Sequence, residues 1–356
     1  MCACLEIHVH GHMVLRVTCK HCECVVDPSS RAIRTSPGFK GQVNLFWEGG
    51  PRTVLLVKKK HSEDAEQARD LVKAFLESRG VKTLSEEACG DYNVDFCIAL
   101  GGDGTLLHLN AQMFQREDQP VYPVLSFALG TLGFLTNFDI RDYDSILSRM
   151  LGADSSETGV AVNLRMRIRC KLLQHEGAEP MVFQALNEAV MHSSSVSIAC
   201  LDLFVDGEML TSVRADGLII STPTGSTAYS MSAGGSMVAP SVPAILVTPI
   251  CPHSLSFRPA VLPNSSEIKV VLPNSAGSSL SVSFDRRDSL RLEPGGSMEI
   301  TMSEFPIPTI SSSAFNQDWF HSIKHKLFWN ASHINSTPVD PSIRTFLLEQ
   351  HHRASL

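Results

Sequence analysis

The sequence predicts an α/β N-terminal domain with a mainly parallel, Rossmann-like sheet, followed by a mostly β C-terminal domain. Up to about residue 155, short apolar runs alternate with segments whose apolar residues recur every three to four positions, which is typical of parallel strands joined by helices. Beyond that point, short β-like segments are separated by turn signals such as Asp206-Gly207. A final amphipathic segment predicts a C-terminal helix near 317–328.

These patterns divide the 356 residues into five parts. The boundaries follow from the Pro- and Gly-rich start, the change of periodicity near residue 155 and the polar end of the sequence. The predicted parts are an irregular N-terminal arm (1–50), an α/β nucleotide-binding domain (51–155), a β-rich substrate domain (156–315), a C-terminal helix (316–330) and a polar tail (331–356).

The α/β domain is expected to begin with a buried strand at Thr53–Val57. A helix should follow from Ser62 to Arg79, because Ser62 can accept an N-cap hydrogen bond and Gly80 can end the helix. Another helix is expected near 142–150. The side chains that the first helix should bury are Ala65, Ala68, Leu71, Val72, Phe75 and Leu76.

The β domain is expected to begin with one half-buried antiparallel strand. Between Val162 and Leu172, apolar residues alternate strictly with Asn, Arg and Lys. The only helix expected inside this domain lies after Ser226.

The composition excludes several classes of protein. A hydrophobic content of 43% and a charged content of 19% are typical of an ordinary globular protein. The formal charge of −7 argues against nucleic acid as the main partner. No apolar stretch in the sequence approaches the ~18 residues of a membrane span, and we expect neither a membrane partner nor a secretory leader.

The ten cysteines favour reduced thiols, mostly buried, and a cytoplasmic location over a disulfide framework. Five of them lie within the first 24 residues, together with several histidines. Cys19-Lys20-His21-Cys22 has the spacing of half a metal knuckle, but the sequence has no matching second half. We therefore interpret this part as a thiol-rich arm.

The most informative motif is Gly101-Gly102-Asp103-Gly104-Thr105, which lies between an apolar strand and a helix. Glycine lets backbone approach a ligand, and free N–H groups at a helix N-terminus bind phosphate. An acid would repel phosphate there, so Asp103 either caps the helix or accepts a proton from an attacking hydroxyl, the reading we favour. The motif lacks the Gly-Lys-[Ser/Thr] ending of a P-loop.

Three further segments carry polar groups suited to a ligand. Asn187-Glu188 lies inside a β-like run, where both side chains reach one ligand only near a strand end or bulge. Arg214–Gly235 is rich in hydroxyls and small residues, which suits a polyhydroxylated or phosphorylated ligand. Thr248–Pro259 is stiffened by prolines and carries His253 and Arg258, although packing alone explains it equally well.

Together these motifs resemble the NAD kinase family, and its eukaryotic cytosolic branch in particular. The resemblance covers about residues 50–330, and the motifs occur in the family's order. The matching segments are Gly101–Thr105, Leu132–Thr136, Asn187-Glu188, Asp216–Ser232 and Pro249–Pro259.

The resemblance implies ATP-dependent phosphorylation of the adenosine ribose 2′-hydroxyl of NAD to give NADP. It implies that Asp103 is the general base and that Mg²⁺ bridges the ATP phosphates, with Glu188 as a candidate metal contact. It also implies a homo-oligomer, dimer or tetramer, in which Asp216 contacts the nicotinamide end of a substrate held by a neighbouring subunit.

The resemblance further assigns substrate and nucleotide contacts by position. Asn187 and Glu188 would hold the ribose, and Tyr229 with its neighbours would surround the adenine. The full implied set is Gly101, Gly102, Gly104, Thr105, His108, Asn187, Glu188, Arg214, Asp216, Thr224, Thr227, Ala228, Tyr229, Ser232 and Cys251.

Three positions depart from the family pattern. Ala215 replaces a glycine, His192-Ser193-Ser194 replaces an acidic-Arg-Gly turn, and Arg286 replaces the glycine of an Asp-Gly-Arg motif. The last exchange could strain the backbone. Two alternative functions remain: a catalytically impaired nucleotide sensor, and another Gly-Gly-Asp-Gly kinase acting on a lipid or sugar phosphate. The Asp216–Ser232 motif is not expected in the latter.

Overall fold

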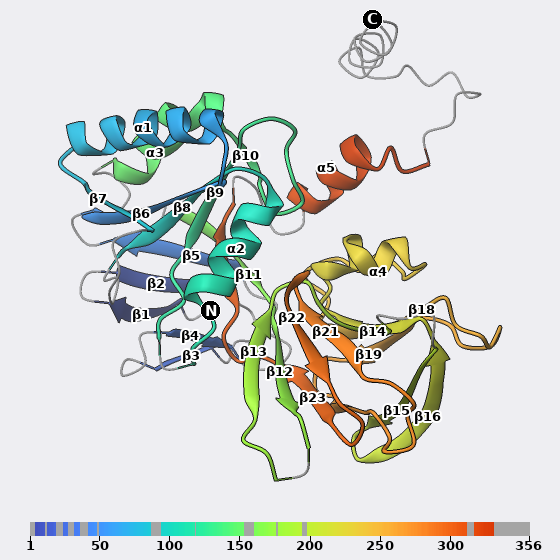
Figure 1. Ribbon diagram of the computed structural model, residues 1–356. Helices are drawn as coiled ribbons and strands as arrows, with labels where there is room; N and C mark the ends of the chain where they lie inside the picture. Colours follow the sequence, from blue (N-terminus) through green and yellow to red (C-terminus); the bar gives the residue numbers. More distant parts are fainter. Residues whose placement is uncertain are drawn as a thin grey trace, which may run out of the picture. The chain divides into compact units, whose positions relative to one another are not determined.

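The first sheet has ten strands, and six of them run parallel to a neighbouring strand, so the sheet is mostly parallel, as predicted (Figure 1). Its strand order is β1-β2-β5-β11-β24-β9-β8-β6-β7, with β10 paired to β9. The central apolar runs are buried on both faces, which is typical of parallel strands covered by helices. The parallel strands are β6 (Thr53–Lys58), β7 (Lys82–Ser85), β8 (Phe96–Leu100), β9 (Val124–Ala128), β10 (Phe138–Asp139) and β24 (Ile307–Ile310).

Three helices cover the two faces of this sheet. α1 (Glu63–Ser78) and α3 (Tyr143–Leu151), the latter preceded by the short η1 (Ile140–Asp142), pack on one face, and Figure 1 shows them side by side. α2 (Asp103–Met113) packs on the other face. The arrangement confirms the predicted α/β class.

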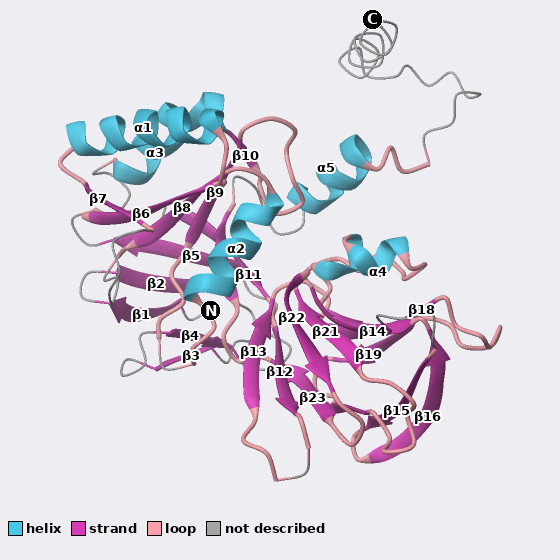
Figure 2. Ribbon diagram, viewed as in Figure 1, coloured by secondary structure: helices cyan, strands magenta, loops and turns pink. Residues whose placement is uncertain are grey.

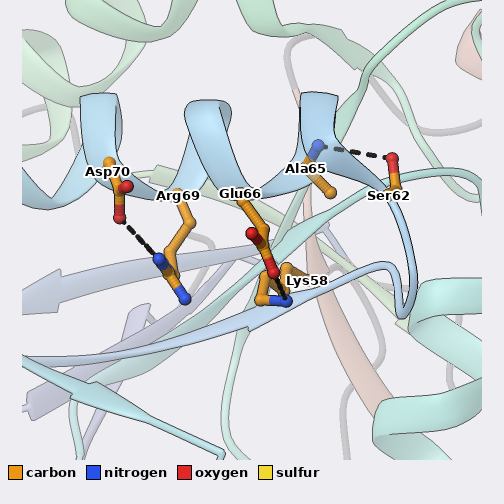
Figure 3. A network of polar contacts seen from close by, with 6 residues as sticks. All are labelled: Lys58, Ser62, Ala65, Glu66, Arg69 and Asp70. Atoms are coloured by element: carbon orange, nitrogen blue, oxygen red, sulfur yellow. Dashed lines mark hydrogen bonds and ion pairs between the residues drawn. The ribbon is translucent and has the colours of Figure 1, made fainter.

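The predicted cap of α1 is present. The Ser62 hydroxyl accepts a hydrogen bond from the Ala65 N–H (3.4 Å), and Lys58 at the end of β6 pairs with Glu66 at 2.8 Å (Figure 3). The predicted buried face of α1 is correct for four residues, but Leu71 is 47% exposed and Phe75 is half-buried.

The other four strands of the sheet are antiparallel, and three of them come from the first fifty residues. β5 pairs with β11, which follows residue 155, and β2 and β1 extend the sheet further. The prediction of an irregular arm is therefore wrong for this part of the chain. The strands concerned are β1 (Cys4–His10), β2 (Met13–Thr18), β5 (Gln42–Trp47) and β11 (Val160–Arg165), with a separate hairpin of β3 (Cys24–Asp27) and β4 (Ala32–Thr35).

The C-terminal domain is built on two antiparallel sheets of six strands each. Figure 2 shows that strands dominate this part of the molecule. Apolar residues from both sheets form one buried cluster, so the sheets pack face to face. The first sheet contains β12 (Ile168–Leu173), β13 (Met181–Ala185), β15 (Ala199–Val205), β16 (Glu208–Ala215), β20 (Ile268–Val271) and β23 (Ser297–Met302). The second contains β14 (Glu188–Ser193), β17 (Gly217–Ser221), β18 (Ala244–Ile250), β19 (Ala260–Pro263), β21 (Leu280–Phe284) and β22 (Arg287–Leu292).

The predicted single strand over Val162–Leu172 is two strands in different sheets. β11 ends at Arg165 and β12 begins at Ile168, because the buried Arg167 turns inward between them. Its Nε donates to the Phe305 carbonyl (2.6 Å) and its Nη1 donates to Oδ1 of Asn110 (3.0 Å). β11 and β24 thus complete the first sheet, although the sequence boundary assigns both to the second domain.

The last predicted helix is confirmed as α5 (Gln317–Lys326). The chain divides into two units, Met1–Trp319 and Phe320–Leu356, and the sheets described above belong to the first. None of the helices in the described part has the length and apolar content that crossing a membrane requires. The predicted polar tail lies outside the described residues, which are 4–10, 13–18, 24–27, 32–35, 42–47, 50–86, 94–117, 119–152, 160–175, 177–193, 198–311 and 317–330.

The side chains of four cysteines are described, and all four are free thiols. Cys97 and Cys170 are buried, as expected, whereas Cys200 and Cys251 are exposed. The side chains of the N-terminal Cys/His cluster lie outside the described residues.

Candidate functional site

The Gly-rich loop joins β8 to α2 in the predicted manner. Gly101 has a φ of +156°, and a Cβ at this position would overlap with Oγ1 of Thr105, so the loop requires glycine here. α2 begins at Asp103 with Gly102 as its N-cap, and Gly102 and Gly104 are exposed. The helix N-terminus is therefore open to a ligand.

The Asp103 carboxylate binds the second glycine motif. Its Oδ2 accepts the N–H of Phe134 (2.8 Å), and its Oδ1 accepts the N–H groups of Leu135 (3.0 Å) and Thr136 (3.2 Å) and the Thr136 hydroxyl (3.1 Å). A Cβ on Gly133 would overlap with Oδ1. These contacts fix the orientation of Asp103.

A buried arginine lies beside the same loop. Arg165 is 4% exposed, and its Nη2 donates to the Phe134 carbonyl (3.4 Å). Burial lowers the pKa of its guanidinium, while the carboxylates of Asp103 and Asp318 oppose that shift. The sequence analysis missed Arg165, because it stands in an alternating strand where Arg at an outward position is ordinary.

Asn187 and Glu188 lie where β13 passes into β14, so a strand end allows both to serve one site, as the sequence required. The buried Asp285 holds this backbone: Oδ2 accepts the N–H of Leu186 (2.9 Å), and Oδ1 accepts those of Asn187 (2.7 Å) and Glu188 (3.2 Å). Burial raises the pKa of Asp285, although these N–H groups oppose the shift.

The Glu188 carboxyl is a second acid of the site whose pKa is raised. Burial, and then the neighbouring Asp285 carboxylate, raises the pKa of Glu188 to about 7, against the opposing effects of Arg286 and of a hydrogen bond from the Tyr229 N–H. Its Oε2 has no hydrogen-bond partner among the described residues. A buried acceptor without a partner is costly unless a ligand meets it.

The hydroxyl-rich segment packs directly on Asn187. The Thr222 hydroxyl donates to the Leu186 carbonyl (2.6 Å), and the Thr222 N–H donates to the Asn187 carbonyl (2.9 Å). A Cβ on Gly225 would overlap with that same carbonyl. The segment continues as η2 (Gly225–Thr227) and α4 (Tyr229–Ser232), so the helix after Ser226 is present but has only four residues, fewer than the two turns expected.

The site residues of this segment differ in their exposure. Thr224 is buried, Ser232 is exposed, and Thr227, Ala228 and Tyr229 are half-buried. The Tyr229 N–H, which hydrogen-bonds to the Glu188 carboxyl, places the start of α4 beside that group.

A hairpin turn connects the two halves of the site. β21 and β22 are joined by Asp285 (φ +50°) and Arg286 (φ +59°), a two-residue turn of type I′. Arg287 then reaches α2: Nη1 donates to Nδ1 of His108 (3.0 Å), and Nη2 donates to the Gly104 carbonyl (3.1 Å). The turn therefore links the Gly-rich loop to Asn187 and Glu188.

Asp285 and Arg287 were not among the predicted site residues. The expected Asp-Gly-Arg motif at this place was the signal that could have found them. The predicted residue His108 is 6% exposed, and its Nε2 contacts Glu86. His108 is therefore buried and connects α2 to the β21–β22 hairpin through its hydrogen bond with Arg287.

Arg214, Asp216 and Cys251 form a second, exposed group. The Asp216 N–H donates to the Ile250 carbonyl (2.9 Å), and the Arg214 carbonyl accepts from His253 N–H (3.0 Å). Along β17, Gly217 pairs with Ile250, whereas Ser221 pairs with Glu188. At ~3.3 Å per residue, Asp216 lies about 16 Å along the strand from Ser221, so the second group is separate from the first.

No group of three or more His, Cys, Asp or Glu side chains that could hold a metal ion occurs within the described ranges.

An α/β domain with a Gly-rich strand–helix loop is joined to a β sandwich that carries a buried carboxyl oxygen without a partner among the described residues, and this combination is typical of a two-domain nucleotide-binding protein. Residues 55–154 match the family model of the ATP-NAD kinase N-terminal domain, and residues 186–312 match that of the ATP-NAD kinase C-terminal domain. The chain belongs to the NAD kinase family, as its motifs predicted.

Named relatives agree with this assignment. The chain is 39% identical over 330 residues to "NAD kinase 2, chloroplastic" of Arabidopsis thaliana, covering 86% of this chain and 33% of that protein. It is 42% identical over 254 residues to an ATP-NADH kinase of Saccharomyces cerevisiae, covering 66% of this chain and 48% of that protein. The chain thus spans between a third and a half of the length of these two relatives.

A solved structure has the same fold. The yeast NADH kinase complexed with NADH superposes with a TM-score of 0.75 at 30% sequence identity, covering 85% of this chain and 93% of that one.

Proposed function

We propose that this chain transfers the γ-phosphoryl group of ATP to the adenosine ribose 2′-hydroxyl of NAD or NADH, giving NADP or NADPH. The observation that carries the proposal is the Asp285–Arg287 turn, which joins the Asp103 loop to the Asn187-Glu188 strand end. Membership of the NAD kinase family and the likeness to the yeast NADH kinase support a dinucleotide acceptor.

In the proposed mechanism Asp103 accepts the proton of the 2′-hydroxyl as that oxygen attacks the γ-phosphorus. The hydrogen bonds from Phe134, Leu135 and Thr136 hold its carboxylate in one orientation. A base whose orientation is fixed needs no further ordering before it takes the proton. The exposed glycines of the loop leave room for phosphate at the N-terminus of α2.

The acceptor nucleoside would lie over the start of β14. The free Oε2 of Glu188 accepts a hydrogen bond from a ribose hydroxyl, which satisfies a buried atom that otherwise lacks a partner. Tyr229, Ala228, Thr227 and Thr224 supply the half-apolar surface that an adenine ring requires.

Mg²⁺ is proposed to arrive with ATP. In kinases this ion keeps several waters and is held by one or two carboxylates together with substrate phosphates, and a single free carboxylate oxygen such as Glu188 Oε2 fits that environment. The ion would neutralise charge on the transferred phosphoryl group.

A homo-oligomer, dimer or tetramer, is proposed from the division of the site. Arg214, Asp216 and Cys251 lie at the far end of β17 from Glu188 and are exposed, so they can serve a dinucleotide held by a neighbouring subunit. We also propose a cytoplasmic location, which the free thiols support.

The test is incubation of the purified chain with ATP, Mg²⁺ and either NAD or NADH. The proposal predicts a product that an NADP-specific dehydrogenase can use. Dinucleotide binding without any product would favour the sensor alternative. Phosphorylation of diacylglycerol or fructose 6-phosphate without phosphorylation of either dinucleotide would contradict the proposal.

A further inference from the structure

Arg286 occupies a backbone conformation that its side chain disfavours. It is the second residue of the type I′ turn, with φ +59°, where glycine or asparagine is preferred. Its side chain is 63% exposed, so burial of apolar surface does not offset the strain. A strained residue retained beside a site points to a role for its side chain there.

The guanidinium lies between two groups of the proposed acceptor site. Its Nε is 3.9 Å from Oε1 of Glu188, and its Cζ is 5.1 Å from the centre of the Tyr229 ring. An ion pair of 3.9 Å from a guanidinium that is 63% exposed, and a cation–π contact from the same exposed group, each contribute little stability, although Glu188 itself is buried. Within the described part of the chain Arg286 donates no hydrogen bond, so its N–H fork is available to a ligand.

The proposed reaction adds negative charge close to the Arg286 guanidinium. Glu188 is the ribose contact and Tyr229 the adenine contact of the proposed function. A phosphate ester formed on that ribose places roughly two negative charges close to the Glu188 carboxylate. Like charges at that spacing repel unless a cation lies between them.

We propose that Arg286 binds the newly formed 2′-phosphate and so makes this chain bind its phosphorylated product more tightly than its unphosphorylated substrate. Arginine suits this role because its planar fork donates two parallel hydrogen bonds to phosphate oxygens. The inference rests on the proposed function, since it uses the same ribose site. Its consequence is inhibition of the enzyme by its own product.

The experiment measures dissociation constants of NAD and NADP by titration calorimetry, without ATP and with chelator present. Arg286→Asn removes the cation but keeps a residue that tolerates positive φ, so the turn is preserved. We expect NADP binding to weaken about tenfold or more and NAD binding to change by about twofold at most. Arg286→Gly should give the same result, and its more permissive turn guards against a folding defect.

Arg286→Lys is the matched control, because it keeps the charge without the fork. Its NADP affinity should fall between those of the parent and Arg286→Asn. Equal changes for NAD and NADP, or no change for either, would overturn the inference while leaving the kinase proposal intact. Failure of the parent chain to bind either dinucleotide would overturn both.

Discussion

Gly133 and Asp103 are so close that a Cβ on the glycine would overlap with Oδ1 of the aspartate. The second glycine motif is therefore shaped around the carboxylate of the first. Gly133→Ala should displace Asp103, lower the free energy of unfolding by about 1–3 kcal/mol and greatly reduce NADP formation. Chemical denaturation and a coupled assay measure the two effects.

Gly130 in the same loop is the matched control. No atom lies within 4 Å of a Cβ built there, so Gly130→Ala should leave stability within about 0.5 kcal/mol and retain activity. Equal losses of stability and activity in the two variants would contradict the explanation that overlap with Asp103 causes the effect of Gly133→Ala.

A second prediction concerns the acceptor for the Leu186–Glu188 backbone. Asp285→Ala removes the partner of three backbone N–H groups and of the Asn110 amide, which is 3.1 Å from Oδ2. The loss should cost about 3 kcal/mol or more and weaken dinucleotide binding. Urea denaturation and calorimetry measure both. Asp202→Ala, which removes a single exposed bond to Ser212, should cost less than about 1 kcal/mol.

A third prediction concerns pH. The pKa of Glu188 is raised from 4.5 to about 7 in the folded chain, so the folded state binds this proton more tightly than the unfolded state. The contribution of Glu188 therefore lowers the free energy of unfolding as pH rises from about 4.5 to 7, and is constant outside that window. Its size is at most about 3 kcal/mol.

Glu188→Gln removes this effect. The quantity of interest is the free energy of unfolding of the variant minus that of the parent, with chelator present and nucleotide absent. This difference should be about 2 kcal/mol larger at pH 8 than at pH 5. Urea unfolding at the two pH values gives the difference. Glu208→Gln, on an exposed position of β16, controls for the exchange itself. The same gain at both pH values would mean that the folded chain does not raise the pKa of Glu188.

A fourth prediction tests the division of the site between subunits. Asp103→Asn and Asp216→Asn should each be inactive or nearly so as separate preparations. The two variants are co-expressed with different tags, and dimers that carry both tags are purified. If each site combines Asp103 of one subunit with Asp216 of the other, one of the two sites in such a dimer keeps both aspartates. Activity should return to about half of the parent value. Mixed oligomers as inactive as the single variants would place Asp216 outside the neighbouring subunit's site.

Local patterns predicted much of the fold. The Ser62 cap, the strand before Gly101 and the turn at Asp206-Gly207 depend on neighbouring residues and are all present. β5 was missed because it pairs with β11, more than a hundred residues later, and no local signal specifies that pairing. Leu71 fits the apolar period of α1, but it is 47% exposed, because packing of the helix on the sheet leaves that side chain partly uncovered.

The sequence indicated part of the candidate site, but not Arg165, Asp285 or Arg287, and not how the residues are arranged. The sequence indicated Asp103, Glu188 and Tyr229, which the structure brings to one region through the Asp285–Arg287 turn. It did not indicate that Asp103 would be held by the Gly133–Thr136 loop. That contact joins two motifs about thirty residues apart, and only the pairing of β8 with β9 brings them together.

The most direct test of the account is the turnover of Asp103→Asn with ATP, Mg²⁺ and NAD, measured beside its dissociation constant for NAD. Asparagine keeps the size of the side chain and one acceptor oxygen for the Phe134–Thr136 loop, but it cannot take the hydroxyl proton. We predict a loss in kcat of about a hundredfold or more, with NAD affinity changed by less than about threefold. A variant that forms NADP at the parent rate would contradict the role of Asp103 as the base.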